Sequence, residues 1–301
     1  MVVQRFTGKL NRLVHLQYEG PDVRQEDVLL SADDVVGQLY RHDGTTLFLG
    51  HYTRERITQA LEEVGILDRL RAKGYEDLII GVSSLDRFDH RLNIHVDRRS
   101  PETLIGQIVL REGVFRPKRQ PLPRRPIERL NLLFIEWILM QDIRGAFTPD
   151  RKRLPGQSYP GLGVGRQVVE LLVRVALQMK KEGILNCPEY FHNARFYSTR
   201  ASFLFLDPRR QALMDVIRRD LPDLNVADLS FAVHHGCVVD RDSRAPLAWE
   251  AAEQIHPVSE PLTAYFASRE YRRAYERAMA ARTVALDETK FAAAMARPQE
   301  V

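Results

Sequence analysis

Cysteine is scarce in this chain of 301 residues, which has only Cys187 and Cys237. Two cysteines cannot form a disulfide-rich framework, and this pair lies too far apart in sequence for a CxxC metal or redox motif. Long apolar runs are also missing, because none approaches the roughly 20 residues that a membrane helix needs. The first twenty residues contain no uninterrupted apolar segment typical of a signal peptide. We therefore expect a protein of the reducing cytoplasm with no membrane association.

A strong excess of one charge is likewise absent. Lys and Arg number 44 against 40 Asp and Glu, which gives a net charge of +4. Such a balance does not by itself indicate nucleic-acid binding, although it permits an anionic ligand. The basic clusters "RPKR", "PRRP" and "DRKR" have no aromatic residues interleaved for base stacking. They are interpreted first as solvated connectors and second as a grip on a ligand phosphate.

The order of predicted elements indicates an α/β or α+β fold. An amphipathic helix is expected from Thr53 to Gly74, and the apolar runs at 76–85, 91–97 and 103–115 are interpreted as two or three strands. The nearly continuous apolar run at 130–142 fits a buried strand or a buried helix, and its aromatic and isoleucine content favours the strand. Residues 115–129 are basic and rich in proline, so they are expected to be an irregular connector. The clearest helix covers 165–181. Strands are then expected at 201–207 and 229–239 around a helix at 208–221, followed by a mostly helical end. The predicted architecture is a mixed central sheet flanked by helices in a domain of residues 1–258, with a helical C-terminal extension at 259–301.

Three glycines stand at alternate positions directly before the clearest helix, in "PGLGVGRQVVELL". Gly161, Gly163 and Gly165 are compatible with two explanations. They form a tight turn between strand and helix, or they bring bare backbone N–H groups to an anion at the helix N-terminus. No Lys-Ser or Lys-Thr pair follows, which excludes a P-loop, and the spacing differs from the GxGxxG of dinucleotide-binding folds.

The sequence resembles the GNAT family of acyl-coenzyme A-dependent N-acyltransferases over roughly residues 50–210. "PGLGVGRQVVELLVRVALQMKKEGIL" is similar to the loop and helix that follow the central strand of that family, and "HNARFYSTRASFLF" is similar to its asparagine, alanine and tyrosine segment. The chain departs from the family by having Pro160 where Arg or Gln is usual. A longer segment also precedes its glycine loop. The resemblance implies that an acetyl-CoA or another acyl-CoA is held by Gly161, Leu162, Gly163, Val164, Gly165 and Arg166, with no metal.

Two residues are candidates for the chemistry of acyl transfer to an amine. Glu136 interrupts the apolar run "LLFIEWILM", where burial would raise the pKa of its carboxyl and suit it to act as a general base. The alternative is that Glu136 pairs with an arginine such as Arg144 or points outward. By the resemblance, Tyr197 is the group that protonates the departing thiolate, and the alternative is a packed aromatic ring.

Other polar residues have weaker patterns. His192 and Asn193 lie in an aromatic-rich segment and are candidates to orient the substrate, against a local capping role. His234 and His235 precede Cys237, but on a strand they would point to opposite faces, so no metal site is predicted there. Cys187 is expected to be a buried structural thiol.

The sequence therefore predicts an N-acyltransferase acting on a small-molecule or protein amine. Two alternatives stay open: a non-catalytic protein of the same fold that binds a phosphorylated ligand or a protein partner, and a basic nucleic-acid-associated protein. Homo-oligomer formation is also left open.

Overall fold

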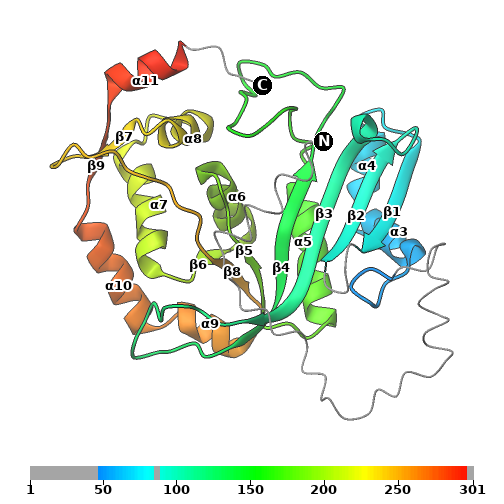
Figure 1. Cartoon of the computed structure of the whole chain (residues 1–301), viewed down its shortest axis with the longest axis horizontal. Helices are drawn as coiled ribbons and strands as arrows, with labels where there is room; N and C mark the ends of the chain where they lie inside the picture. The colour runs from blue at the N-terminus through cyan, green and yellow to red at the C-terminus, as the bar shows by residue number, and fades with distance from the viewer. Residues whose placement is uncertain (1–46, 85–88, 297–301) are drawn as a thin grey trace.

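The structure is a computed structural model that describes residues 47–84 and 89–296 (Figure 1). The N-terminal segment on which the signal-peptide prediction was made lies outside these residues. The strands are β1 (Leu78–Ser84), β2 (Asp89–Val96), β3 (Leu104–Phe115), β4 (Leu130–Met140), β5 (Gly183–Asn186), β6 (Leu204–Phe205), β7 (Val238–Asp240), β8 (Gln254–Pro257) and β9 (Val284–Leu286). The α-helices are α3 (Arg54–Glu63), α4 (Ile66–Arg71), α5 (Gly165–Gln178), α6 (Phe191–Ala201), α7 (Pro208–Asp220), α8 (Val226–His234), α9 (Glu260–Phe266), α10 (Arg269–Ala280) and α11 (Glu288–Met295).

A mixed sheet of seven strands runs through the molecule in the order β1-β2-β3-β4-β5-β8-β6. Neighbouring strands are antiparallel except β4 and β5, which are parallel. The crossover between these two parallel strands contains α5, as parallel pairs require. The predicted α+β class, with a mixed sheet and flanking helices, is confirmed.

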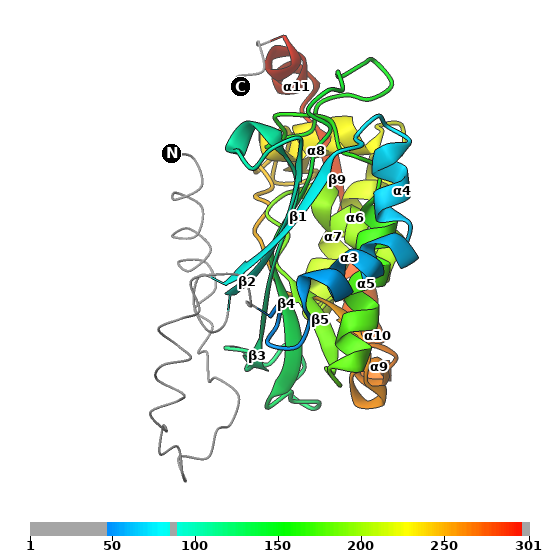
Figure 2. The ribbon, with the colours of Figure 1, turned by 90° about the vertical axis from the view of Figure 1, so that its right-hand side faces the viewer.

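One face of strands β1 to β4 is covered by helices. Figure 2 shows α3, α4 and α5 on the same side of these strands. The alternation of β2 explains this packing, since His90, Leu92, Ile94 and Val96 are buried while the residues between them are half-exposed. The apolar face of α5, which includes Val168, Leu172 and Val175, joins the same core cluster. This face of the sheet fixes the position of α5 and of the loop before it.

In the N-terminal half, the structure differs from the predicted boundaries of one helix and one connector. The single helix expected from Thr53 is two helices, because Gly65 has a φ of 74° and ends the first helical run. Of the connector expected at 115–129, Phe115 ends strand β3, and residues 116–129 contain no helix or strand and join the antiparallel strands β3 and β4. The three apolar runs interpreted as two or three strands are β1, β2 and β3, and the run left open between strand and helix is strand β4.

The C-terminal half contains two larger differences. The strand expected at 229–239 was wrong for its first part, which is helix α8, and only β7 is extended. Asn225 explains the helix, because its side chain accepts hydrogen bonds from the N–H groups of Ala227 and Asp228. In the segment expected to be helical, β9 instead pairs antiparallel with β7. No helix in the described part of the chain is long and apolar enough to span a membrane.

Candidate functional site

Strands β4 and β5 run side by side for only three residue pairs. Leu132, Leu133 and Phe134 pair with Gly183, Ile184 and Leu185, and the pairing then stops although β4 continues to Met140. Beyond the last pair, the described residues include no strand that hydrogen-bonds to this edge of β4. The edge closes again only where the N–H of Leu162 donates to the carbonyl of Met140 at 3.1 Å. A stretch of β4 backbone is thus open between the parting of the strands and the glycine loop.

The glycine loop lies at the end of this open edge and leads directly into α5. The N-cap position is Val164, no side chain caps the helix, and its first turn contains no acidic residue. The N–H groups of Gly165 and Arg166 accordingly have no backbone or side-chain acceptor among the described residues. This helix start retains the free donors and positive dipole end that favour an anion.

The three glycines differ in what the fold requires of them. Gly163 has a φ of 77°, a backbone conformation that favours glycine, and the space where a side chain would begin is open. Gly165 is in contact with the Phe196 ring of α6, so a Cβ there would collide with the ring. Gly161 meets neither condition, because its nearest neighbour in the Cβ direction is the Met140 carbonyl oxygen at 3.7 Å. Turn geometry therefore accounts for Gly163 and close packing for Gly165.

The non-glycine residues expected to hold the acyl-CoA differ in burial and in hydrogen bonding. Leu162 is buried and its N–H is engaged by Met140, so this group is not available to a ligand. Arg166 is exposed in the first turn of α5. Arg151, from the long segment between β4 and α5, donates to the carbonyl of Gly161. The structure thus brings a cation to the loop although Pro160 replaces the Arg or Gln of the family pattern.

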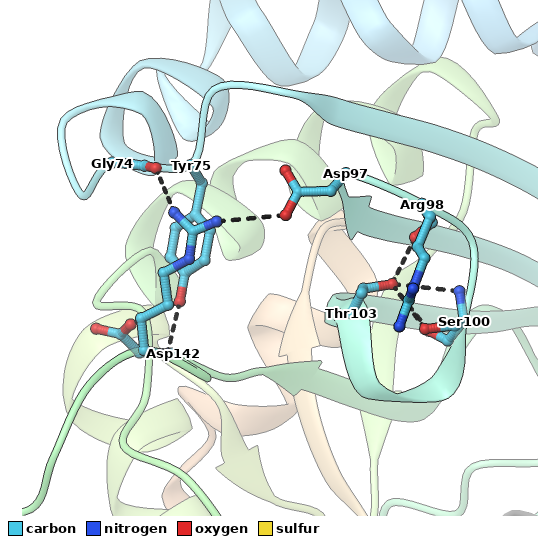
Figure 3. Close-up of polar contacts among 8 residues, drawn as sticks. Gly74, Tyr75, Asp97, Arg98, Ser100, Thr103 and Asp142 are labelled. Atoms are coloured by element: carbon cyan, nitrogen blue, oxygen red, sulfur yellow. Dashed lines mark hydrogen bonds and ion pairs between the residues drawn. The ribbon is translucent and has the colours of Figure 1, made fainter.

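Asp142 anchors this arrangement just after β4. Its backbone N–H donates to the Pro160 carbonyl at 2.7 Å. Its carboxylate accepts a hydrogen bond from Tyr75 Oη at 2.8 Å (Figure 3). It also accepts one from Lys73 Nζ at 2.9 Å. Burial opposes ionisation of Asp142, but these two hydrogen bonds and the charges of Lys73 and Arg151 outweigh it and lower the pKa of the carboxyl. Asp142 therefore connects the turn after α4 to the segment that contains Arg151.

Glu136 occupies a β-bulge in β4. Val109 of β3 pairs with Trp137 and the next residue, Leu110, pairs with Ile135, so Glu136 is the extra residue. Its Oε1 lies 3.5 Å from Nε of Arg111. Burial raises the pKa of Glu136, Arg111 lowers it and Asp89 raises it, and the net shift is upward.

The alternative that Glu136 pairs with an arginine is present in the structure, but the arginine is Arg111 and not the suggested Arg144. Arg144 donates to the Gly74 carbonyl at 2.6 Å and lies over the Tyr75 ring. Arg111 forms ion pairs with two carboxylates, those of Glu136 and Asp89, and its Nη2 lies 2.6 Å from Oδ1 of Asp89.

Tyr197 lies on α6, the helix whose Phe196 contacts Gly165. Its ring packs against Phe203 at a centroid distance of 5.1 Å. Burial raises the pKa of the Tyr197 phenol, and a polar interaction with the Asn186 carboxamide offsets part of this rise. The aromatic packing considered as the alternative for Tyr197 is therefore present, on a helix that also contacts the glycine loop through Phe196.

His192 and Asn193 begin the same helix but have different surroundings. His192 is buried, and its Nδ1 lies 2.7 Å from Oγ of Ser230 in α8. Burial, with a smaller effect of His234, lowers the pKa of His192 to about 4. These contacts place His192 in the core between α6 and α8. Asn193 is half-buried, and its backbone N–H donates to the Tyr190 carbonyl at 3.1 Å.

The remaining polar candidates form no metal centre in the part of the chain that the structure describes. His234 and His235 lie at the end of α8, so the strand argument used for them does not apply. Cys187, expected to be buried, is half-buried and packs against the core cluster that contains Phe134 and Leu185.

Comparison with known proteins finds no matching protein family and no similar curated protein. The site must therefore be argued from its geometry. Three contributors to it were not identified in the sequence: Arg111, Arg151 and Asn186. Only Arg151 had a signal, since it belongs to the basic cluster "DRKR" interpreted secondarily as a phosphate grip.

Proposed function

We propose that the chain is an acyl-CoA-dependent N-acyltransferase that moves an acetyl or longer acyl group to an amine. One observation carries the proposal. The open edge of β4 ends at the uncapped, glycine-lined start of α5. An extended arm with a pyrophosphate at one end suits such a site, because strand edges bind extended chains and helix N-termini bind phosphates.

The order of elements around the opening supports the same proposal. β4 leads through the glycine loop to α5, then to the parallel strand β5 and to α6 with Tyr197. This is the succession that the GNAT resemblance implies for the central strand, loop, helix, next strand and tyrosine segment. Arg151 at Gly161 and the exposed Arg166 add positive charge where the phosphates would lie.

The chemistry follows from the two sides of the opening. Glu136 lies on the same face as Phe134 of one core cluster, because its ion-pair partner Arg111 is the cross-strand neighbour of Phe134. Tyr197 packs against the cluster on the opposite side. An acyl thioester between the parted strands would thus lie between the two groups. Glu136 would accept the proton of the amine as its nitrogen attacks the carbonyl carbon. Tyr197 would then give a proton to the departing sulfur. The raised pKa of Glu136 makes it a stronger base than an ordinary carboxylate.

Thioester turnover tests this function. Purified protein would be incubated with acetyl-CoA and a panel of amines, including polyamines, amino sugars and basic peptides, and free thiol would be measured. Thiol release that depends on one class of amine supports the proposal. Acetyl-CoA binding without turnover on any amine would instead favour the non-catalytic alternative. In that case Glu136 serves only as the ion-pair partner of Arg111.

A further inference from the structure

The excess positive charge of the chain is concentrated on one surface, which the connector between β3 and β4 and helix α10 form together. The connector, residues 116–129, has six Lys and Arg against one Glu and contains the clusters "RPKR" and "PRRP". Helix α10 has four Arg against two Glu. The two segments thus carry a net charge of +7, whereas the whole chain carries +4. The rest of the chain is therefore negative, and the basic residues are gathered on this connector–α10 surface.

The connector and α10 lie side by side although they are far apart in sequence. Nε of Arg125 in the connector lies 3.6 Å from Oε2 of Glu270 in the first turn of α10. Leu122 and Ile127 of the connector belong to the same core cluster as Tyr271 of α10. Figure 1 shows the connector beside α9 and the start of α10. The charges of the two segments therefore belong to one continuous surface.

Helix α10 packs through one face and exposes its arginines on the other. Tyr271 is buried and Tyr275 and Met279 are half-buried, at intervals of four residues that define one helix face. The exposed cations of α10 are Arg269, Arg272, Arg273 and Arg277. Those of the connector include Lys118, Arg119, Arg124 and Arg129. None of these eight side chains forms an ion pair or a hydrogen bond with another described residue.

This lack of partners distinguishes the surface from other exposed parts of the described chain. Arg71 pairs with Glu62 and Arg174 pairs with Glu170, although all four side chains are exposed. Clustered cations without carboxylates repel one another, so the fold gains no stability from gathering them in one place. An external partner of opposite charge accounts for the cluster.

The chemistry of the surface indicates which partner it fits. The large hydrophobic side chains that are exposed on the described residues all lie outside the connector and α10. A helix that binds a membrane surface needs an apolar face toward the lipid, and a specific protein interface needs an apolar centre. A phosphate backbone requires only cations. Nine of the ten cations are arginines, whose guanidinium groups pair with phosphates through two hydrogen bonds.

We propose that the connector–α10 surface binds the phosphate backbone of a double-stranded nucleic acid. No aromatic ring of the two segments is exposed, so the surface lacks the stacking platform that single strands use, and it does not read base sequence. The connector precedes β4 and the glycine loop follows it, so this surface lies at the other end of β4 from the candidate acyl-CoA site. The inference is independent of the proposed acyl transfer.

Salt-dependent binding tests the proposal. Short labelled duplexes of DNA and of RNA would be titrated with the full chain by fluorescence anisotropy at a series of salt concentrations. We expect binding to at least one duplex, with a slope of log K against log salt of about −4 or steeper, which corresponds to about five phosphate contacts or more. The double variant Arg272→Gln, Arg273→Gln should reduce this slope by about two and lower the affinity at low salt by about ten-fold. Lys118→Gln with Arg119→Gln tests the connector in the same way.

The matched control is the double variant Arg98→Gln, Arg99→Gln. These two arginines are also adjacent and exposed, but they precede β3, whereas the connector follows it. The control should bind the duplexes as the wild type does, and urea unfolding should show that all variants are folded. Equal losses in the α10 and control variants would overturn the inference, because only the total charge would then matter. Absence of wild-type binding to both duplexes would also overturn it, and binding to phosphatidylserine vesicles instead would assign the surface to a membrane.

Discussion

Phe134 of β4 and Leu185 of β5 are the last residues of two parallel strands to pair before the strands part. The pair fixes the geometry of the candidate site. Glu136 lies two residues beyond it on one strand, and Asn186 lies one residue beyond it on the other. The β-bulge at Glu136 lies in the same place, in line with the tendency of bulges to occur beside functional sites.

Replacing Glu136 by Gln should separate binding from chemistry. The acetyl-CoA affinity is expected to stay within about two-fold of wild type, whereas turnover falls by about 10² to 10⁴, the usual effect of losing a general base. At neutral pH the variant should be as stable as the wild type or more so, because a carboxyl whose pKa is raised by burial destabilises the fold when it ionises. Unchanged turnover would exclude Glu136 as the base.

Asp89→Asn provides a graded test of the same site. The negative charge of Asp89 helps to raise the pKa of Glu136, and Asp89 also holds Arg111 at 2.6 Å. Its neutralisation should lower the pKa of Glu136, so the acidic limb of the rate profile should move to lower pH while the maximal rate is retained. A profile that does not move would show that ionisation of Glu136 does not control the rate.

Asp142→Asn should weaken both the fold and the glycine loop. The substitution leaves Lys73 without its ion-pair partner and removes the carboxylate near Arg151. A loss of about 2 kcal/mol in the free energy of unfolding is expected from breaking a partly buried ion pair whose carboxylate also accepts a tyrosine hydrogen bond. Urea unfolding measures this, and Arg144→Ala, which leaves the Asp142 contacts with Lys73 and Arg151 in place, is the control expected to cost less. Equal losses would contradict the anchoring role of Asp142.

His192 should make the protein sensitive to mild acid. Burial lowers the pKa of His192 to about 4 in the folded protein. In the unfolded chain the same imidazole is protonated near pH 6.5, so between these pH values only the unfolded state binds the proton. Stability should therefore be lost as the pH falls from about 6.5 to about 4, by up to on the order of 3 kcal/mol. His192→Gln should flatten this dependence in urea titrations at successive pH values. The control His51→Gln, at an exposed histidine, should show the same dependence of unfolding free energy on pH as the wild type. If His192→Gln keeps the wild-type dependence, His192 is not its cause.

The sequence predicted the elements whose pattern is local. The alternation of β2 and the amphipathic face of α5 are visible in the residues themselves, and so is the apolar run of β4. Helix α8 was mistaken for a strand because Leu229, Phe231 and Val233 form an apolar run that periodicity does not resolve, although the Asn225 cap was present in the sequence. β9 depends on pairing with β7, a distant contact that no local pattern indicates.

The site was predicted less completely than the fold for the same reason. The glycine loop and Glu136 are conspicuous in the sequence, because one is an unusual spacing and the other is a charge in an apolar run. Arg111, Arg151 and Asn186 contribute through strand register and loop path, which only the folded chain defines. Leu162 was predicted from the loop pattern to bind the ligand, but the structure shows that its N–H donates to the Met140 carbonyl.

The most direct test of the account is calorimetric titration of acetyl-CoA into the wild type, Gly163→Val and Gly65→Val. Gly163 and Gly65 both have positive φ and open space at the Cβ position, so the two substitutions impose similar backbone strain at different places. Saturable binding to wild type and Gly65→Val, with an affinity at least about ten-fold lower for folded Gly163→Val, is the result expected if the loop holds the phosphates. Absence of binding to the wild type, or equal binding to all three proteins, would show that the glycines form only a turn.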